Sequence, residues 1–449
     1  MRLLIPIFAA AALVGCSDSS TPTGPAEPAA KGTRSNITVS STVAGGLRDR
    51  NVQPTSFKVR IENIAASHAN SASGAFNTPV GASAPGALLP GNSYSFSFAA
   101  GPGSMLSFAT MFVQSNDLFY GAQGISLFEG TTAITGDITA QVGLWDAGSE
   151  VNQEPGVGAD QAPRQSGANT GAAESGNVRL VNDGFTYPNV SDNIRVSLSH
   201  SGETFTVTVE NLAASNTPLA PGVYAVHTSG NPLYDSGSPD RGLGLAALAE
   251  DGNPADLAAA LAAATGLSSP LAPGVFIAHR NSAPLFSNGS TDRGLGLAAL
   301  AEDGNPADLA AALTNANSGV FNTPVGASGP GALLPGSAYE FSVTAKAGDR
   351  LSFATMFVQS NDLFYAPSAA GIALFDGSGI PLSGDITSHI SLWDAGSEVN
   401  QAPGAGADQA PRQASANTGT TEGGNVRLVD DDFSYPSVGS IIRVTIAVQ

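Results

Sequence analysis

The chain contains the segment Leu392-Trp393-Asp394-Ala395-Gly396-Ser397-Glu398-Val399-Asn400-Gln401. The same residue types occur in the same order from Leu144 to Gln153. A second repeated segment precedes each copy and runs from Leu106 to Tyr120 and from Leu351 to Tyr365. Both Trp residues of the protein lie in these segments, together with three acidic residues in each copy. We therefore expect a duplicated fold whose chemistry lies in these paired segments.

The repetition extends well beyond these segments. The strand-like segment Phe57–Ser67 is similar to Phe205–Ser215. A repeat on this scale indicates a tandem pair of domains instead of a solenoid. We place the first copy at residues 36–200 and the second at residues 201–449. Further matching pairs are Phe76–Ser83 with Phe321–Ser328 and Asn177–Val181 with Asn425–Val429.

The second copy is the longer one. The number of residues between a segment and its match in the other copy is larger after the first strand than at that strand, so the second copy contains additional residues. We place a duplicated insertion at about residues 219–317, since Asp240–Leu257 returns unchanged at Asp292–Leu309. Each inserted unit is expected to form one strand and two short helices rich in Ala and Leu. Gly252 is the expected cap of the first helix, and Asn253 with Pro254 the expected start of the second.

Most of the remaining sequence consists of short runs that predict strands. Polar and apolar residues alternate in the segment that begins at Phe57, which is typical of a strand with one buried face. Short strands separated by Gly, Pro, Asn and Asp turns indicate antiparallel sheets packed face to face. The predicted fold class is therefore mainly β, with two tandem antiparallel β-sandwich domains and the helical insertion in the second. Other expected strands are Ser93–Ala99, Tyr339–Ala345 and Ile441–Val448.

The first residues have the features of a bacterial lipoprotein signal peptide, which we place at residues 1–15. Arg2 supplies a positive charge, Leu3–Val14 is apolar, and Cys16 follows a small residue. We expect lipidation of Cys16 to anchor the protein to a membrane. Residues 16–35 are mainly Ser, Thr, Pro, Ala and Gly and predict a disordered tether. The expected location is the bacterial cell envelope, at the outer membrane or cell surface.

Composition excludes some classes of function. The formal net charge is -19, and only 18 Lys and Arg residues are spread over 449 residues. A nucleic-acid-binding protein needs clustered basic residues to neutralise phosphates, so nucleic acid is not an expected partner. Cys16 is the only cysteine, so the chain cannot form an internal disulfide. Stability must come from core packing, and from a metal ion if one is bound.

The repeated acidic residues have the chemistry that hard cations prefer. Ca²⁺ takes six to eight oxygen ligands from carboxylates, carbonyls and water. Asp394 and Glu398 lie on either side of Gly396, which lets the chain turn so that both carboxylates face one ion. Asp362, in the preceding repeated segment, could supply a third carboxylate. The same spacing is also consistent with a solvated turn that binds nothing. The equivalent residues of the first copy are Asp117, Asp146 and Glu150.

At these residues the chain resembles the spondin N-terminal domain. The family's phrase Ser-Pro-Asp-Trp corresponds to Ser360–Leu363, and its phrase Trp-Asp-Ala-Gly-Thr-Asp corresponds to Trp393–Glu398. Glu replaces the family's final Asp, and the cysteines of the animal domains are missing. The resemblance implies a β-sandwich that holds one Ca²⁺ in each copy. The ligands that it implies are the carboxylates of Asp117, Asp146, Glu150, Asp362, Asp394 and Glu398 and the backbone carbonyls of Ala147 and Ala395.

No catalytic motif accompanies these residues. The five His residues lack metal-ligand spacing, and the sequence contains neither a nucleophile elbow nor a phosphate-binding loop. We therefore expect a non-enzymatic, calcium-binding lipoprotein whose loops adhere to an unidentified extracellular polymer or protein. Two alternatives stay open. Paired carboxylates could act as acid and base in an enzyme that cleaves extracellular glycans, or the protein could be a purely structural component of the envelope.

Overall fold

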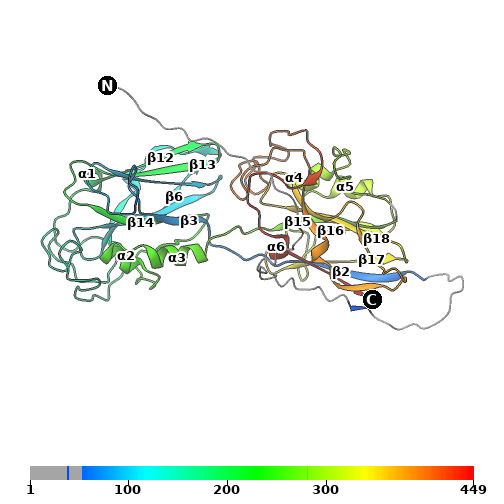
Figure 1. Cartoon of the computed structure of the whole chain (residues 1–449), viewed down its shortest axis with the longest axis horizontal. Helices are drawn as coiled ribbons and strands as arrows, with labels where there is room; N and C mark the ends of the chain where they lie inside the picture. Colours follow the sequence, from blue (N-terminus) through cyan, green and yellow to red (C-terminus); the bar gives the residue numbers. More distant parts are fainter. Residues whose placement is uncertain (1–37, 40–52, 281) are drawn as a thin grey trace, which may run out of the picture. The chain divides into compact units, whose positions relative to one another are not determined.

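The computed structural model describes residues 38–39, 53–280 and 282–449 of the chain. These residues form a mainly β structure of antiparallel sheets packed as β-sandwiches, which confirms the mainly β, β-sandwich part of the predicted fold class (Figure 1). No helix in this part of the chain is both long and apolar enough to cross a membrane. The predicted signal peptide, the lipidated Cys16 and the tether lie outside the described residues.

The first sandwich consists of two sheets with a common hydrophobic core. Side chains such as Phe108 and Tyr120 from the larger sheet meet Phe96, Phe205 and Val207 from the smaller one. The larger sheet has the order β11 (Arg179–Leu180), β10 (Gly143–Asp146), β6 (Leu118–Ser126), β5 (Met105–Phe112), β14 (Leu219–His227) and β3 (Asn70–Phe76). The smaller sheet has the order β4 (Ser93–Ala99), β13 (Thr204–Asn211), β12 (Ile194–Ser201) and β9 (Gly136–Asp137). A separate pair is formed by β7 (Phe128–Glu129) and β8 (Thr132–Ala133), and the short helices are η1 (Thr139–Gln141) and α1 (Val190–Asn193).

The second sandwich has the same arrangement, with its own core between two sheets. The larger sheet has the order β16 (Ser318–Phe321), β15 (Leu271–His279), β18 (Arg350–Phe357), β19 (Leu363–Pro367), β22 (Ile390–Asp394) and β23 (Arg427–Leu428), with β20 (Ile372–Ala373) paired to β18. The smaller sheet has the order β1 (Thr38–Val39), β21 (Leu382–Asp385), β24 (Ile442–Val448), β2 (Thr55–Asn63) and β17 (Ala338–Ala345). The short helices are η2 (Thr387–His389) and α6 (Val438–Ile441).

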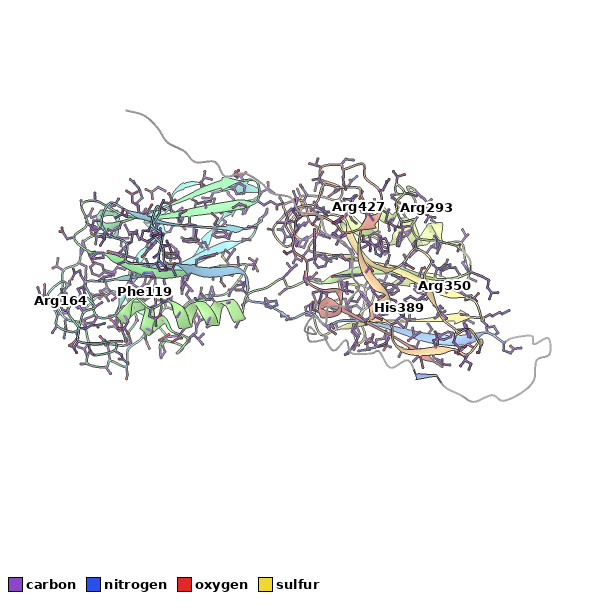
Figure 2. All side chains as sticks on the ribbon, in the orientation of Figure 1. Phe119, Arg164, Arg293, Arg350, His389 and Arg427 are labelled. Carbon is purple, nitrogen blue, oxygen red and sulfur yellow. The ribbon has the colours of Figure 1, made fainter. Side chains whose placement is uncertain are left out.

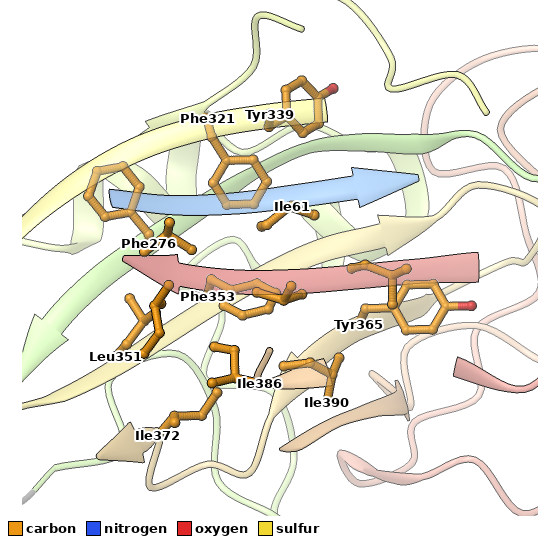
Figure 3. Close-up of a cluster of buried hydrophobic side chains, with 14 of the residues drawn as sticks. Ile61, Phe276, Phe321, Tyr339, Leu351, Phe353, Tyr365, Ile372, Ile386 and Ile390 are labelled. Atoms are coloured by element: carbon orange, nitrogen blue, oxygen red, sulfur yellow. The ribbon is translucent and has the colours of Figure 1, made fainter. Parts of the chain in front are cut away.

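The strand pairing contradicts the domain boundary predicted between residues 200 and 201. β2 and β13 have matching sequences, yet β13 lies between β4 and β12 of the first sandwich. β2 instead lies between β17 and β24 of the second sandwich, with antiparallel partners on both sides. Figure 3 shows β2 in blue between a yellow strand and the red β24, with Ile61 facing the core. The first sandwich therefore begins at β3 and ends after β14 and its helices, and the second sandwich uses a strand from the start of the chain.

β2 is an integral part of the core of the second sandwich. Phe57, Val59 and Ile61 are fully buried there, and they alternate with partly exposed residues along the strand. Burying a large apolar side chain contributes about 1.5–3 kcal/mol. These three side chains therefore contribute roughly 5–9 kcal/mol before conformational entropy is counted, which makes β2 a central part of the second core.

The helical units are not an insertion in the second copy, as the sequence had predicted. Each sandwich contains one unit: β14 with α2 (Leu245–Asp251) and α3 (Ala255–Ala263), or β15 with α4 (Leu297–Asp303) and α5 (Ala307–Ala312). The helices pack against the larger sheet, so this sheet is buried on both faces. The predicted cap is confirmed, because Gly252 ends α2 with a φ of 65°. The Asn253 side chain accepts a hydrogen bond from the Ala255 amide at 3.1 Å, where α3 begins.

Candidate metal centre

Two of the predicted acidic residues meet at the ends of neighbouring strands. Asp394 is the last residue of β22, and Asp362 immediately precedes β19. These two strands are antiparallel neighbours, with Leu363 opposite Asp394. Both aspartates are fully buried. The structure therefore brings together two carboxylates that lie more than 30 residues apart in the sequence.

Asp362 uses only one of its carboxylate oxygens. Its Oδ2 accepts hydrogen bonds from the Ser397 amide at 2.7 Å, the Ser397 hydroxyl at 3.1 Å and the Glu398 amide at 3.0 Å. Its Oδ1 is buried and has no hydrogen-bond partner. An unpaired buried oxygen on a carboxylate is costly, because the charge has lost its water. Asp362 therefore offers an oxygen that a cation could bind.

Asp394 shapes the loop that follows β22. Its Oδ1 accepts a hydrogen bond from the Gly396 amide at 2.6 Å, which closes a tight turn. Gly396 has a φ of 70°, and a Cβ added there would lie 2.7 Å from the backbone of Gly424. Glycine is required here both for the positive φ and for the close approach. The Oδ2 of Asp394 accepts hydrogen bonds from Asn400 at 2.9 Å and from Arg427 at 2.7 Å.

The third acidic residue of the cluster is Glu422, which corrects the prediction for Glu398. Oxygens from Asp362, Asp394 and Glu422 all lie within 4.8 Å of one another. The carboxylate of Glu398 instead accepts hydrogen bonds from the Gly419 amide at 3.0 Å and from Asn361 at 3.4 Å. Two residues four positions apart in a turn need not face the same way, so the spacing between Asp394 and Glu398 did not place both at one ion.

Arg427 lies within this cluster. It is opposite Asp394 in the pairing of β22 with β23, and its Nη2 lies 2.7 Å from Asp394 and 2.9 Å from Glu422. The guanidinium thus offsets part of the negative charge of the three carboxylates. Its side chain is about one third exposed, so it has a route out of the cluster.

The first sandwich repeats most of this geometry. The Oδ2 of Asp117 accepts from the Ser149 amide at 2.7 Å and from the Glu150 amide at 3.0 Å, and its Oδ1 is again unpaired. Asp146 accepts from Arg179 at 2.7 Å. Among the residues that the structure describes, only the second sandwich brings three carboxylate oxygens within 4.8 Å. Glu150 does not complete such a group, because its carboxylate accepts from the Gly171 amide at 2.9 Å.

The predicted carbonyl ligands lie beside the clusters. Ala147 and Ala395 are almost fully buried, and their amides donate to the carbonyl oxygens of Asp117 and Asp362, each at 3.1 Å. These hydrogen bonds fix each Trp-Asp-Ala-Gly loop against the segment that carries the other aspartate. The participation of the two alanine carbonyls in metal binding stays a prediction.

The helical units also contribute to the clusters, which the sequence did not predict. Glu302, near the end of α4, is almost buried, and its side chain bonds to Ser397. In the first sandwich, the side chain of Glu250 in α2 likewise forms a hydrogen bond with Ser149. The unchanged repetition of Asp240–Leu257 was the only sequence signal for these residues. Sequence alone did not show that the helices cover the loops that carry the aspartates.

Burial and mutual repulsion make the carboxylates hard to ionise. Burial, followed by the neighbouring Asp394 carboxylate, raises the pKa of Asp362 to about 7. Burial, followed by Asp117, raises the pKa of Asp146 to about 6. Burial also raises the pKa of Glu250 to about 7. The negative charge of the ionised carboxylates in each cluster is therefore not fully balanced by their surroundings. A bound cation would supply the missing positive charge.

The residues present fit a calcium ion. The available donors are carboxylate oxygens, which suit a hard cation, and Asp362 also has a buried oxygen, Oδ1, without a hydrogen-bond partner. Arg427 would have to release Asp394 for that oxygen to bind the ion. The chain matches no protein-family model and no curated protein.

Proposed function

We propose that this protein is a non-enzymatic, calcium-binding lipoprotein that adheres to an extracellular polymer or protein through two spondin-like sandwiches. The observation that carries the proposal is the cluster of the buried Asp362 and Asp394 with the exposed Glu422, in which one Asp362 oxygen is unpaired. The calcium ion would hold β19, β22 and the loop before β23 together. It would thereby order the loops at that end of the sandwich for binding.

Burial of the carboxylates favours a binding role over the alternative of a glycan-cleaving enzyme. Asp362 and Asp394 are fully buried, as are Asp117 and Asp146. A glycosidase needs two carboxylates that flank an accessible glycosidic bond. The arrangement here has no exposed pair of that kind, so these aspartates suit a structural ion. Glycan turnover that is lost in Asp394→Asn would overturn the non-enzymatic part of the proposal.

The cell-surface role rests on the sequence. The predicted signal peptide and the predicted lipidation of Cys16 support anchoring in the bacterial envelope, at the outer membrane or cell surface, and the two copies of the sandwich support more than one contact with a partner. The remaining alternative is a purely structural envelope protein. Calcium-dependent retention of extracellular polymer or protein on beads that carry this protein, absent from uncoated beads, would distinguish adhesion from that alternative.

Thermal unfolding with and without calcium tests the metal centre. A ligand at 100 times its Kd stabilises the folded state by about 2.7 kcal/mol for each site. We expect Ca²⁺ to raise the unfolding midpoint of the wild type, and EGTA to reverse the increase. Asp362→Asn and Glu422→Gln should reduce the increase that comes from the second sandwich.

The matched control is Glu398→Gln. The sequence predicts Glu398 as a calcium ligand, but in the structure its carboxylate accepts a hydrogen bond from the Gly419 amide. This variant should keep most of the calcium response. Loss of the response in Glu398→Gln, with retention in Glu422→Gln, would refute the geometry of the cluster. A wild type that is indifferent to Ca²⁺ would refute the metal centre itself.

A further inference from the structure

The second sandwich contains a cavity that is separate from the carboxylate cluster. It has a volume of about 400 Å³, within the range of small-molecule sites in proteins. Residues from both sheets line it, and most of its wall is aliphatic. Figure 3 shows two of these residues, Ile372 and Ile386, next to each other at the edge of the core. The aliphatic wall consists of Ile372, Leu382, Ile386 and Ile446.

The charge of the cavity is opposite to that of the whole chain. Its lining contains two basic residues, Arg350 and His389, and no Asp or Glu. Both are labelled in Figure 2. The chain as a whole carries 37 acidic and 18 basic residues. A cavity with only basic charged groups in so acidic a protein would attract an anion and exclude a cation.

Arg350 is held in place at the cavity. Its Nε donates to the carbonyl of Ala370 and its Nη2 to the carbonyl of Gly371, both at 2.7 Å. A guanidinium has five N–H donors, so donors remain for a ligand. The fixed position lowers the entropy that the side chain would lose when a ligand binds.

The first sandwich provides an internal comparison. Its residues at the equivalent positions are Met105 and Gln141 in place of Arg350 and His389. The aliphatic positions are retained as Ile125, Ile134, Ile138 and Leu198. The loop that ends at Gly371 is also two residues longer than its counterpart that ends at Gly124. The second sandwich therefore differs from the first in having basic groups and a longer loop around an aliphatic framework that both sandwiches share.

We propose that this cavity binds a small amphipathic anion, namely a carboxylate with a short aliphatic chain. The chain would lie against the isoleucines, and the carboxylate would accept hydrogen bonds from Arg350 and His389. This activity goes beyond the proposed calcium-dependent adhesion and does not depend on it.

Calorimetric titration of the protein with octanoate tests the proposal. EGTA is present, so the outcome is independent of the metal centre. We expect one octanoate site per chain, with octanol and octylammonium binding at least tenfold more weakly. The double variant Arg350→Met and His389→Gln, which carries the residues of the first sandwich, should lose at least tenfold in octanoate affinity.

The control is Arg293→Gln, which removes an exposed arginine that does not line the cavity and should leave octanoate binding unchanged. Thermal unfolding of each variant, compared with the wild type, establishes that the fold is retained. The proposal is overturned if octanoate does not bind. It is also overturned if the double variant binds octanoate as tightly as the wild type, or if octanol binds as tightly as octanoate.

Discussion

The unusual position of β2 leads to a prediction about which sandwich a mutation weakens. Phe57 is near the start of the chain but is fully buried in the second core, where its ring meets Phe375 edge to face at 5.4 Å. We expect Phe57→Ala to destabilise the second sandwich, although Phe57 lies in the first copy as counted along the sequence.

The structure sets both the magnitude and the assay. Replacing a buried Phe by Ala costs about 3–5 kcal/mol, because the lost contacts are not recovered and a cavity remains. For a unit of roughly 200 residues this lowers the midpoint by about 6–20 °C. Trp145 lies in the first sandwich and Trp393 in the second, so each reports on one core. Trp145→Phe leaves Trp393 fluorescence as the reporter of the second sandwich, and Trp393→Phe leaves Trp145 as the reporter of the first.

The matched control is Phe205→Ala, because Phe205 occupies the equivalent place in β13 and is equally buried. Phe205→Ala should lower the transition that Trp145 reports by a similar amount. A larger effect of Phe57→Ala on Trp145 than on Trp393 would falsify the assignment of β2. It would also support the domain boundary that sequence order suggests.

Three further predictions concern the site and its surroundings. Arg427→Gln removes a positive charge from the carboxylate cluster and should tighten Ca²⁺ binding roughly threefold to tenfold by calorimetry, whereas weaker binding would mean that Arg427 organises the site. Gly396→Ala forces a side chain into a backbone with a φ of 70° and against Gly424, so urea unfolding followed through Trp393 should show a loss of about 1–3 kcal/mol. Burial lowers the pKa of His227, so the unfolded chain binds the proton first as the pH falls. The contribution of His227 to stability should then fall as the pH drops below about 6.5, and His227→Gln should remove it, so that the stability measured through Trp145 falls less, or rises more, between pH 7 and pH 5 than in the wild type; an unchanged slope would contradict this.

Sequence patterns sufficed for the local structure. Alternation of polar and apolar residues located β4 at its observed bounds and β17 within one residue. The Ala- and Leu-rich units formed the expected strand and two helices, with Gly252 as a cap. These features depend on side-chain periodicity and on backbone preferences of single residues, which a sequence displays directly.

The candidate site was only partly visible in the sequence. Asp362 and Asp394 were recognised because both lie in repeated segments, and the pairing of β19 with β22 brings them together. Glu422 and Arg427 were missed as members of the cluster, since their approach depends on the pairing of β22 with β23. The long loop between these two strands hides that pairing from any local pattern. The direction of the Glu398 side chain likewise depends on packing against Gly419.

The assignment of β2 to a sandwich could not follow from its sequence, because β2 and β13 have the same pattern and would fit either place. The choice between them is set by chain connectivity. β13 follows β12 through a tight turn at Gly202, and the two strands pair along their full length with Ser201 opposite Thr204. Closing so short a turn costs little entropy compared with bringing in a distant strand. β13 therefore fills the place beside β12 in the first sandwich, which leaves β2 to complete the equivalent place beside β24 in the second.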